Sequence, residues 1–345
     1  MGQAAEAARH LMAGASLSDS GFDLNDKHIL VTGGGGFIGS RLVELLLARR
    51  FPASLTVVDK FTYAGDRENL NDVREQIILK ELDVCDEALG FDVRRPDVIF
   101  HLAAETHVDR SIENGLPFAQ VDFYGTAVML EWARQWGSRF VFVSTDEVYG
   151  DLQTREIDVA TEDTALAPNN PYSAAKAGAD FMVQAYHRTH GLDTVILRPA
   201  NQYGPRQYPE KLFPRFVYLA MSGQDLTVHG DGAQLREYTH VNDGAMGILL
   251  AGERGASGSI FNIASEEYMT VNEVALAVLH HFGLAETRIA YVEDRPGGDA
   301  RYSISSARAR KELGWEPKVP LDRGVSHTIG WYAGKWANEL PEVAA

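Results

Sequence analysis

Two residues one helical turn apart could together abstract a proton. Tyr172 and Lys176 are separated by four positions, so on a helix their side chains lie on one face. A nearby ammonium favours a phenolate, so we expect Lys176 to lower the pKa of Tyr172 from its ordinary value of about 10. Such a tyrosine, aided by a hydroxyl group, could take the proton of an alcohol while an oxidant accepts the hydride.

A pair of carboxyl groups follows a predicted strand. Thr145, Asp146 and Glu147 come directly after it, at the carboxyl end where open α/β sheets hold ligands. Adjacent carboxyl groups are often simply solvated, but unequal burial can separate their pKa values and divide acid from base work. With a ketone at C4 of a hexose, one group could remove the acidic C5 proton while the other protonates the departing C6 hydroxyl. This pair therefore favours β-elimination.

A glycine cluster between the first predicted strand and the helix after it suits a dinucleotide. Gly33, Gly36 and Gly39 would allow a tight turn, close approach of a pyrophosphate, and packing of helix on strand. The helix N-terminus adds N–H groups and positive partial charge. Asp59 ends the next predicted strand, where a carboxylate binds ribose hydroxyls and repels a 2′-phosphate. We therefore expect NAD rather than NADP, although Lys60 could partly offset that repulsion.

The predicted elements place these groups at one end of a sheet. Short β-branched or apolar runs alternate with helical or polar stretches, a pattern typical of right-handed crossovers and a parallel sheet covered on both faces. The predicted fold class is α/β: a Rossmann-type doubly wound parallel sheet with a smaller C-terminal α/β substrate-binding region. The predicted strands span residues 28–32, 54–59, 76–82, 97–102, 139–144 and 194–197, and the predicted helices span 39–50, 172–190, 271–282 and 306–313.

The chain divides into three predicted regions. Residues 1–26 are expected to form a mobile tail, and residues 27–197 the NAD-binding domain. Beyond these, prolines and glycines break the regular alternation. We therefore expect residues 198–340 to form mainly the substrate-binding region, with some segments returning to the first domain.

Composition narrows the class of partner. The 345 residues include 32 Lys and Arg against 48 Asp and Glu, a net charge of −16, which disfavours nucleic acid and anionic membranes as partners. The single cysteine, Cys85, excludes an internal disulfide framework and a cysteine-based zinc site, and indicates a reducing cytoplasm. No apolar run approaches the roughly 18 residues of a membrane span. We predict no metal.

Several motifs resemble the extended short-chain dehydrogenase/reductase family and, closely, its dTDP-glucose 4,6-dehydratases. The resemblance extends from about residue 28 to residue 335. It implies a nucleotide-diphosphate sugar as substrate and a homodimer joined by helices within residues 117–136 and 172–190. The motifs that carry it are Gly33–Gly39, Thr62–Gly65, Ala104–Ile112, Ser144–Gly150, Asn170–Ala174, Pro209–Leu212, Asp294–Gly297 and Glu312–Trp315.

The resemblance also implies a role for each chemical residue. Asp146 would be the acid for the C6 hydroxyl and Glu147 the base at C5. Tyr172 would be the base for the C4 hydroxyl, aided by Thr145 and tuned by Lys176. Besides Tyr172 and Lys176, the implied cofactor contacts are Gly33, Gly36, Phe37, Ile38, Gly39, Asp59, Lys60, Asp83, Val84, Leu102, Ala103, Ala104 and Thr106. The implied substrate contacts are Thr145, Asn201, Lys211, Arg236, Asn262 and Arg295.

Two features of the sequence leave alternatives for the substrate and the activity. The chain departs from the usual dTDP-glucose pattern at Gln202, Arg206, residues 237–240 and Gly298, which puts the nucleotide base in doubt. Alternative activities are a nucleotide-sugar 4-epimerase and a UDP-glucuronate decarboxylase, which need no acid at C6, so Asp146 discriminates. A non-catalytic NAD-sensing module is a more remote alternative.

Overall fold

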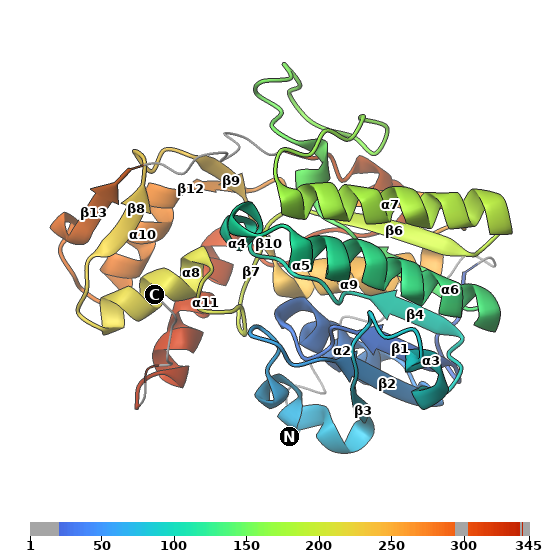
Figure 1. Ribbon diagram of the computed structural model, residues 1–345. Helices are drawn as coiled ribbons and strands as arrows, with labels where there is room; N and C mark the ends of the chain where they lie inside the picture. Colours follow the sequence, from blue (N-terminus) through green and yellow to red (C-terminus); the bar gives the residue numbers. More distant parts are fainter. Residues whose placement is uncertain (1–20, 294–302, 339, 341–345) are drawn as a thin grey trace.

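The computed structural model describes residues 21–293, 303–338 and 340, which build a central seven-stranded sheet in the order β11-β6-β5-β4-β1-β2-β3 (Figure 1). All six neighbouring pairs are parallel. The predicted Rossmann-type α/β fold is confirmed. The strands are β1 (His28–Thr32), β2 (Ser54–Asp59), β3 (Ile78–Glu81), β4 (Val98–His101), β5 (Arg139–Val143), β6 (Thr194–Pro199) and β11 (Ser259–Ile263).

The strand order reverses between β1 and β4. From β1 the chain moves outward through β2 to β3, then returns to place β4 on the other side of β1. The crossovers from β1 and β4 therefore leave in opposite directions, which opens a crevice at the carboxyl ends of these strands. β4, β5 and β6 are buried along their whole length, as expected for strands with helices on both faces.

Helices cover both faces of the sheet. On one face α2 (Phe37–Arg49) packs against α9 (Val241–Arg254), and on the other α6 (Thr126–Trp136) lies beside α7 (Pro171–His190) (Figure 1). A capping box formed by Asn170 and Ser173 starts α7, and Gly191 in the left-handed conformation ends it. This start fixes Tyr172 in the first turn, beside the crevice.

A smaller lobe has its own apolar core. Its parallel pair, β8 (Leu226–His229) with β13 (Ile289–Val292), packs with α8 (Leu212–Met221), α10 (Val271–His281) and α11 (Leu321–Lys335), seen at the left of Figure 1. The remaining elements are η1 (Arg67–Gln76), α3 (Leu89–Asp92), α4 (Val108–Glu113), α5 (Leu116–Phe118), η2 (Ala119–Gly125), η3 (Asp146–Tyr149), β7 (Gln202–Tyr203), β9 (Leu235–Glu237), β10 (Thr239–His240), β12 (Tyr268–Thr270), η4 (Glu286–Arg288) and η5 (Ala309–Leu313).

The two regions exchange segments. α9 and β11 belong to the C-terminal part of the sequence, yet β11 pairs with β6 and α9 packs on α2. At the other end, the expected tail over residues 1–26 extends too far. Leu24 is fully buried in the core of the Rossmann region, and the Phe22 N–H donates to Glu253 O at 2.6 Å. The reason is that Phe22 and Leu24 are apolar and pack against the hydrophobic core of the Rossmann region. Residues 1–20 lie outside the described part.

Leu24 provides a test of this boundary. Leu24→Ala should lower the free energy of unfolding by about 2–5 kcal/mol, because it removes apolar contacts and leaves a cavity. Urea unfolding measures the change. Phe51→Ala, at a side chain 82% exposed, should stay within about 0.5 kcal/mol of wild type. Equal small effects for both variants would show that residues 21–26 do not belong to the folded body.

Candidate functional site

A cavity of about 340 Å³ occupies the crevice at the carboxyl ends of the central strands. The loop after β1 forms one wall and η3 with the start of α7 forms another, while residues 199–211 close the side toward the smaller lobe. Every residue predicted to contact the cofactor lines this cavity, and so do Thr145, Asp146, Glu147, Asn201 and Lys211. Side chains from two regions of the sequence therefore meet at one place.

The glycine loop leaves room for a diphosphate. Gly33 has φ +71°, and a Cβ there would lie 2.7 Å from the backbone nitrogen of Ala103. A Cβ at Gly39 would lie 2.1 Å from Gly33 O, so α2 packs on the loop only because this residue is glycine. Gly36 precedes α2 and no side chain caps the helix. The first turn thus presents backbone N–H groups and positive partial charge to the cavity.

Asp59 is positioned by its own surroundings. Its Oδ2 accepts from the Gly35 N–H and its Oδ1 from the Phe61 N–H, both at 2.8 Å. Burial raises the pKa of this carboxyl despite those two bonds. Lys60 pairs with Asp83, Nζ to Oδ2 at 2.6 Å, so its charge is already engaged and offsets Asp59 less than the sequence alone suggested. With the Lys60 charge engaged by Asp83, the Asp59 carboxylate fits ribose hydroxyls better than a 2′-phosphate.

Lys176 is a buried cation at the base of the cavity. Its side chain is almost fully buried, its ammonium donates to Val143 O at 2.7 Å, and it lies 4.4 Å from the centre of the Phe142 ring. Burial lowers its pKa, while the charges of Asp122 and Asp180 oppose that shift. Its bond to β5 holds the first half of α7 against the sheet.

Tyr172 is buried beside the carboxyl groups. Its pKa is raised, first by burial and then by the charges of Glu147 and Asp122, while a hydrogen bond with Thr145 opposes the shift. The expectation that Lys176 lowers the pKa of Tyr172 is therefore wrong for this structure. Desolvation and three nearby carboxyl groups, Asp146 among them, outweigh any effect of one ammonium.

Thr145 and Asp146 form the start of η3. Thr145 Oγ1 accepts from the Glu147 N–H and donates to Asp146 Oδ1, both at 3.3 Å. Asp146 is 2% exposed, and among the described residues its Oδ2 has no hydrogen-bond partner. Burial, Glu147 and then Glu237 raise its pKa well above the ordinary value. A raised pKa favours the protonated carboxyl, the form in which Asp146 can donate a proton into the cavity.

Glu147 differs from Asp146 in its environment. It is only partly buried, and the Asn170 side-chain amide donates to its Oε2 at 3.4 Å. The adjacent acids therefore face unequal solvation, which is the condition for one to act as an acid and the other as a base.

Two of the predicted substrate residues lie elsewhere. Asn262 is wrong as a substrate contact because β11 joins the sheet beside β6 and buries its side chain, which accepts from the Tyr149 hydroxyl at 2.7 Å. Arg236, in β9, bonds to Leu235 O at 3.2 Å and does not line the cavity. Arg295 lies outside the described residues. Lys211 does reach the cavity, where its ammonium donates to Thr106 O at 2.8 Å.

The positions that depart from the family pattern mostly serve packing. Arg206 pairs with Glu44 at 2.6 Å, Tyr238 lies edge-on to Phe213 within the aromatic core, and His240 caps α9. Gln202 lines the cavity, but a Cβ at Gly244 would lie 2.3 Å from its Oε1, so its amide packs on α9. Gly298, which also departs from the family pattern, lies outside the described residues.

Two acids near the site were missed from the sequence. Asp122 is fully buried in η2, its Oδ1 accepts from the Glu105 N–H at 2.7 Å, and burial raises its pKa to about 7 despite the charge of Lys176. An acid among apolar residues on the inward face of a predicted helix was the available signal. Glu210, next to the predicted Lys211, accepts from the Tyr63 hydroxyl at 3.3 Å and lies 3.5 Å from Arg110.

Other kinds of site receive no support within the described ranges. No cluster of three or more His, Cys, Asp or Glu there could hold a metal ion. None of the helices in those ranges has the length and apolarity needed to cross a bilayer.

Comparison with known proteins identifies the family. The model of the family described as GDP-mannose 4,6 dehydratase matches residues 30–328, and the chain belongs to that family. The curated dTDP-glucose 4,6-dehydratase of Streptomyces griseus is 42% identical over 310 residues, covering 88% of this chain and 94% of that protein. The resemblance predicted from the motifs is thereby confirmed.

Solved structures give the same result and one contrast. The dTDP-glucose 4,6-dehydratase DesIV of Streptomyces venezuelae, solved with NAD bound, is 41% identical with a TM-score of 0.84, covering 89% of this chain and 98% of that one. A UDP-glucose 4-epimerase of Thermotoga maritima is 32% identical with a TM-score of 0.82, covering 89% and 99%. Because both activities share this fold, the fold does not choose between them, and the side chains in the cavity must.

A buried carboxyl whose charge acts on Asp146 predicts a pH-dependent stability. Glu237 is fully buried, and burial raises its pKa to about 7, whereas an unfolded glutamate titrates near 4.3. Its contribution to stability is fully present below the unfolded pKa and is lost as pH rises through 7. Between pH 6 and pH 8 the free energy of unfolding should lose about 1 kcal/mol through this group.

Glu237→Gln should reduce that pH dependence by the same amount, as measured by urea unfolding at pH 6 and pH 8. Glu316→Gln, at an exposed position, is the matched control and should keep the wild-type difference. An unchanged difference in Glu237→Gln would contradict the burial and titration assigned to Glu237.

Proposed function

We propose that this chain is an NAD-dependent nucleotide-sugar 4,6-dehydratase that converts dTDP-glucose to the 4-keto-6-deoxy sugar. Its relatives named dTDP-glucose 4,6-dehydratase support the activity, and NAD in the DesIV structure supports the cofactor. When bound, NAD supplies the oxidant that accepts the hydride of C4 and returns it at C6. Gly33, Gly36 and Gly39 would hold its diphosphate, and Asp59 its adenosine ribose.

The first proton transfer belongs to the α7 side of the cavity. Tyr172 takes the C4 hydroxyl proton, with Thr145 as its hydrogen-bonding aid. Burial raises the pKa of Tyr172, and positive charge near the phenol would lower it and help Tyr172 to act as a base. Lys176, held by Val143 O at 2.7 Å, supplies a fixed positive charge to the same end of the cavity.

We assign the elimination to Asp146 and Glu147 of η3. The environment of Asp146 is the main observation in its support. Asp146 is a buried carboxyl that lines the cavity, with an Oδ2 that no described residue engages and a pKa raised by burial. It protonates the departing C6 hydroxyl, while the less buried Glu147 removes the C5 proton made acidic by the C4 ketone. A 4-epimerase expels no hydroxyl group and needs no acid at that position.

The nucleotide and the hexose are proposed from the relatives and from charge. On a chain of net charge −16, Lys211 brings a cation to the cavity wall, where a diphosphate needs one. Asn201 lines the same wall. Arg236 and Arg295 stay proposals from the resemblance, Arg236 lying outside the cavity lining.

Loss of water tests the proposed reaction. Purified protein with dTDP-glucose should give a product 18 Da lighter by mass spectrometry without consuming added NAD. Asp146→Asn should slow formation of that product by about 10²–10⁴-fold, with a much smaller effect on oxidation at C4. Asp163→Asn, whose side chain is 84% exposed, should behave as wild type.

The same assay with UDP-, GDP- and CDP-glucose separates the nucleotide from the reaction. No 4-keto product from any of the four would rule out the dehydratase proposal. A change of configuration without change of mass would favour the 4-epimerase instead.

We further propose a homodimer in the cytoplasm. The apolar side chains of Leu116, Phe123 and Phe181 are 78%, 37% and 56% exposed and project from α5, η2 and α7. These are the helices that the family resemblance implies at a dimer interface. Cys85 carries a free thiol, in keeping with a reducing compartment.

Charge at this face should separate the subunits. Phe181→Asp should shift the molar mass in light scattering after size exclusion from about twice 38.0 kDa to 38.0 kDa, because an unpaired charge would be buried. Phe51→Asp, at an 82% exposed side chain between α2 and β2, should leave the mass unchanged. A monomeric wild-type protein would contradict this proposal.

A further inference from the structure

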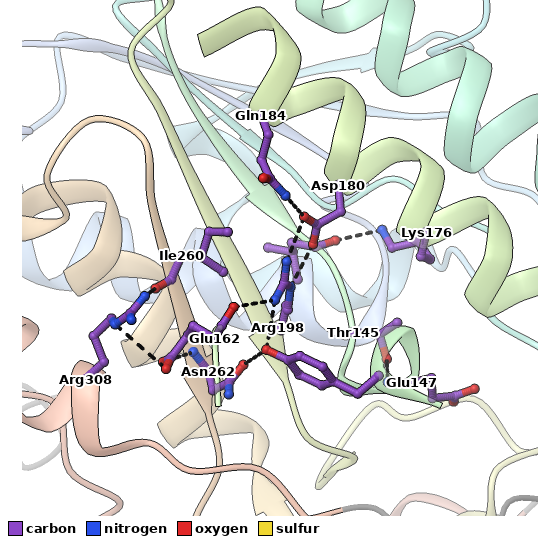
Figure 2. Close-up of polar contacts among 12 residues, drawn as sticks. Thr145, Glu147, Glu162, Lys176, Asp180, Gln184, Arg198, Ile260, Asn262 and Arg308 are labelled. Atoms are coloured by element: carbon purple, nitrogen blue, oxygen red, sulfur yellow. Dashed lines mark hydrogen bonds and ion pairs between the residues drawn. The ribbon is translucent and has the colours of Figure 1, made fainter. Parts of the chain in front are cut away.

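A buried ion pair that takes no part in the proposed proton transfers lies behind the cavity. Arg198, in β6, donates from Nε to Asp180 Oδ2 at 2.8 Å and from Nη2 to Asp180 Oδ1 at 2.9 Å. Arg198 is 2% exposed and Asp180 fully buried. Figure 2 shows the pair between α7 and the sheet, with Lys176 one turn away on the same helix. Neither residue lines the cavity.

Asp180 connects the ion pair to Tyr172 and Lys176, the residues proposed for oxidation at C4. Tyr172, Lys176, Asp180 and Gln184 recur at every fourth position of α7, so they form one stripe along the helix. The Gln184 side-chain amide donates to Asp180 Oδ1 at 2.8 Å (Figure 2). Asp180 also acts on Lys176 by charge, favouring the ammonium form. Anchoring Asp180 therefore anchors the stripe that carries Tyr172 and Lys176.

Tyr149 connects the same ion pair to Asp146 and Glu147, the residues proposed for loss of water. It is the last residue of η3, the single turn that begins with Asp146 and Glu147. Its hydroxyl accepts from Arg198 Nη1 at 2.9 Å and donates to Asn262 Oδ1 at 2.7 Å. Tyr149 is fully buried, so these two bonds set its position.

A further layer fixes Asn262 in turn. Its backbone N–H donates to Glu162 Oε1 at 2.9 Å, and Arg308 lies 3.8 Å from Glu162 Oε2 (Figure 2). Arg198 Nη1 also reaches Glu162 O at 3.3 Å. The side chain predicted as a substrate contact is thus part of the support behind η3.

Stability alone does not account for this arrangement. A desolvated ion pair is often no more stabilising than well-packed apolar side chains of similar volume. A bidentate guanidinium–carboxylate pair instead fixes the relative orientation of its two side chains, because the planar guanidinium makes both hydrogen bonds in only one geometry. Here Nε and Nη2 of Arg198 bind Asp180 on α7, while Nη1 donates to the Tyr149 hydroxyl on η3.

We infer that Arg198, Asp180 and Tyr149 form a positioning unit that holds the η3 carboxyl groups in register with Tyr172 and Lys176 on α7. The inference rests on the proposed function, because it concerns the two halves of that reaction. Oxidation at C4 uses the α7 side, and loss of water uses the η3 side. Loosening the link at Tyr149 should therefore affect the second step more than the first.

Tyr149→Phe tests the unit with a minimal change. It keeps the ring and the ion pair and removes one hydroxyl, so the fold should be retained. With dTDP-glucose, kcat should fall about 10-fold, as expected when reacting groups are misplaced by a fraction of an ångström, while KM stays within about twofold. Rapid quenching should show a 4-keto hexose that still carries its C6 hydroxyl, which wild type does not accumulate.

A control and a second variant keep the test sharp. Tyr186→Phe removes a hydroxyl from α7, one that donates to Glu131 at 2.5 Å, and should leave kcat and the quench pattern unchanged. Arg198→Lys keeps the charge but loses the fork, and should give the Tyr149→Phe pattern more strongly. Amide hydrogen exchange over residues 144–150 should quicken in Tyr149→Phe and not in Tyr186→Phe, independently of any substrate.

Different outcomes overturn different claims. If wild type makes no 4-keto product, the proposed function fails. If wild type turns over and Tyr149→Phe matches it, or slows oxidation and water loss equally, or leaves exchange over residues 144–150 unchanged, the positioning role fails while the function stands.

Discussion

Burial of the Lys176 ammonium is the constraint on which the site depends. A cation removed from water must be compensated, and here the compensation is a bond to Val143 O at 2.7 Å together with the charges of Asp122 and Asp180. Those partners come from β5, η2 and α7. Satisfying one charge therefore fixes the relative positions of three elements, and the first turn of α7, with Tyr172, follows from them.

The same low-polarity surroundings push acids and bases in opposite directions. Burial lowers the pKa of Lys176 but raises those of Asp146, Asp122 and Tyr172. A single cavity thus contains a carboxyl group and a phenol whose pKa values are both raised by burial. This distribution distinguishes the chain chemically from a 4-epimerase of similar fold, because only an elimination requires an acid for a departing hydroxyl.

Local patterns in the sequence predicted much of the fold and the cavity. β1 and β2 have the bounds expected from their apolar runs, and Gly33 and Gly39 occupy positions where a Cβ would clash with backbone. Thr145, Asp146, Tyr172 and Lys176 meet in one cavity because strand ends and helix starts of a parallel sheet share an edge. Such features depend on residues close in sequence or on general topology.

The errors concern partners distant in sequence. The resemblance predicts Asn262 as a substrate contact, but the pairing of β11 with β6 turns it toward Tyr149. Leu24 falls within the predicted tail because the regular pattern of the sequence begins only at residue 28, although its side chain is buried in an apolar core. The spacing predicts a lowered pKa for Tyr172 because it reveals Lys176, but it reveals neither the burial nor the carboxyl charge of Asp122. These outcomes are set by tertiary packing, which a single sequence does not display.

The central claim is that oxidation at C4 and loss of water at C6 occur in one cavity, with the hydrogen of C4 carried to C6. dTDP-glucose bearing deuterium at C4 measures this directly by mass spectrometry and NMR of the product. The expected result is a 4-keto-6-deoxy product with the deuterium in its C6 methyl group. Recovery of the deuterium at C4 of an unreacted or epimerised hexose, or its loss to solvent, would contradict the assignment.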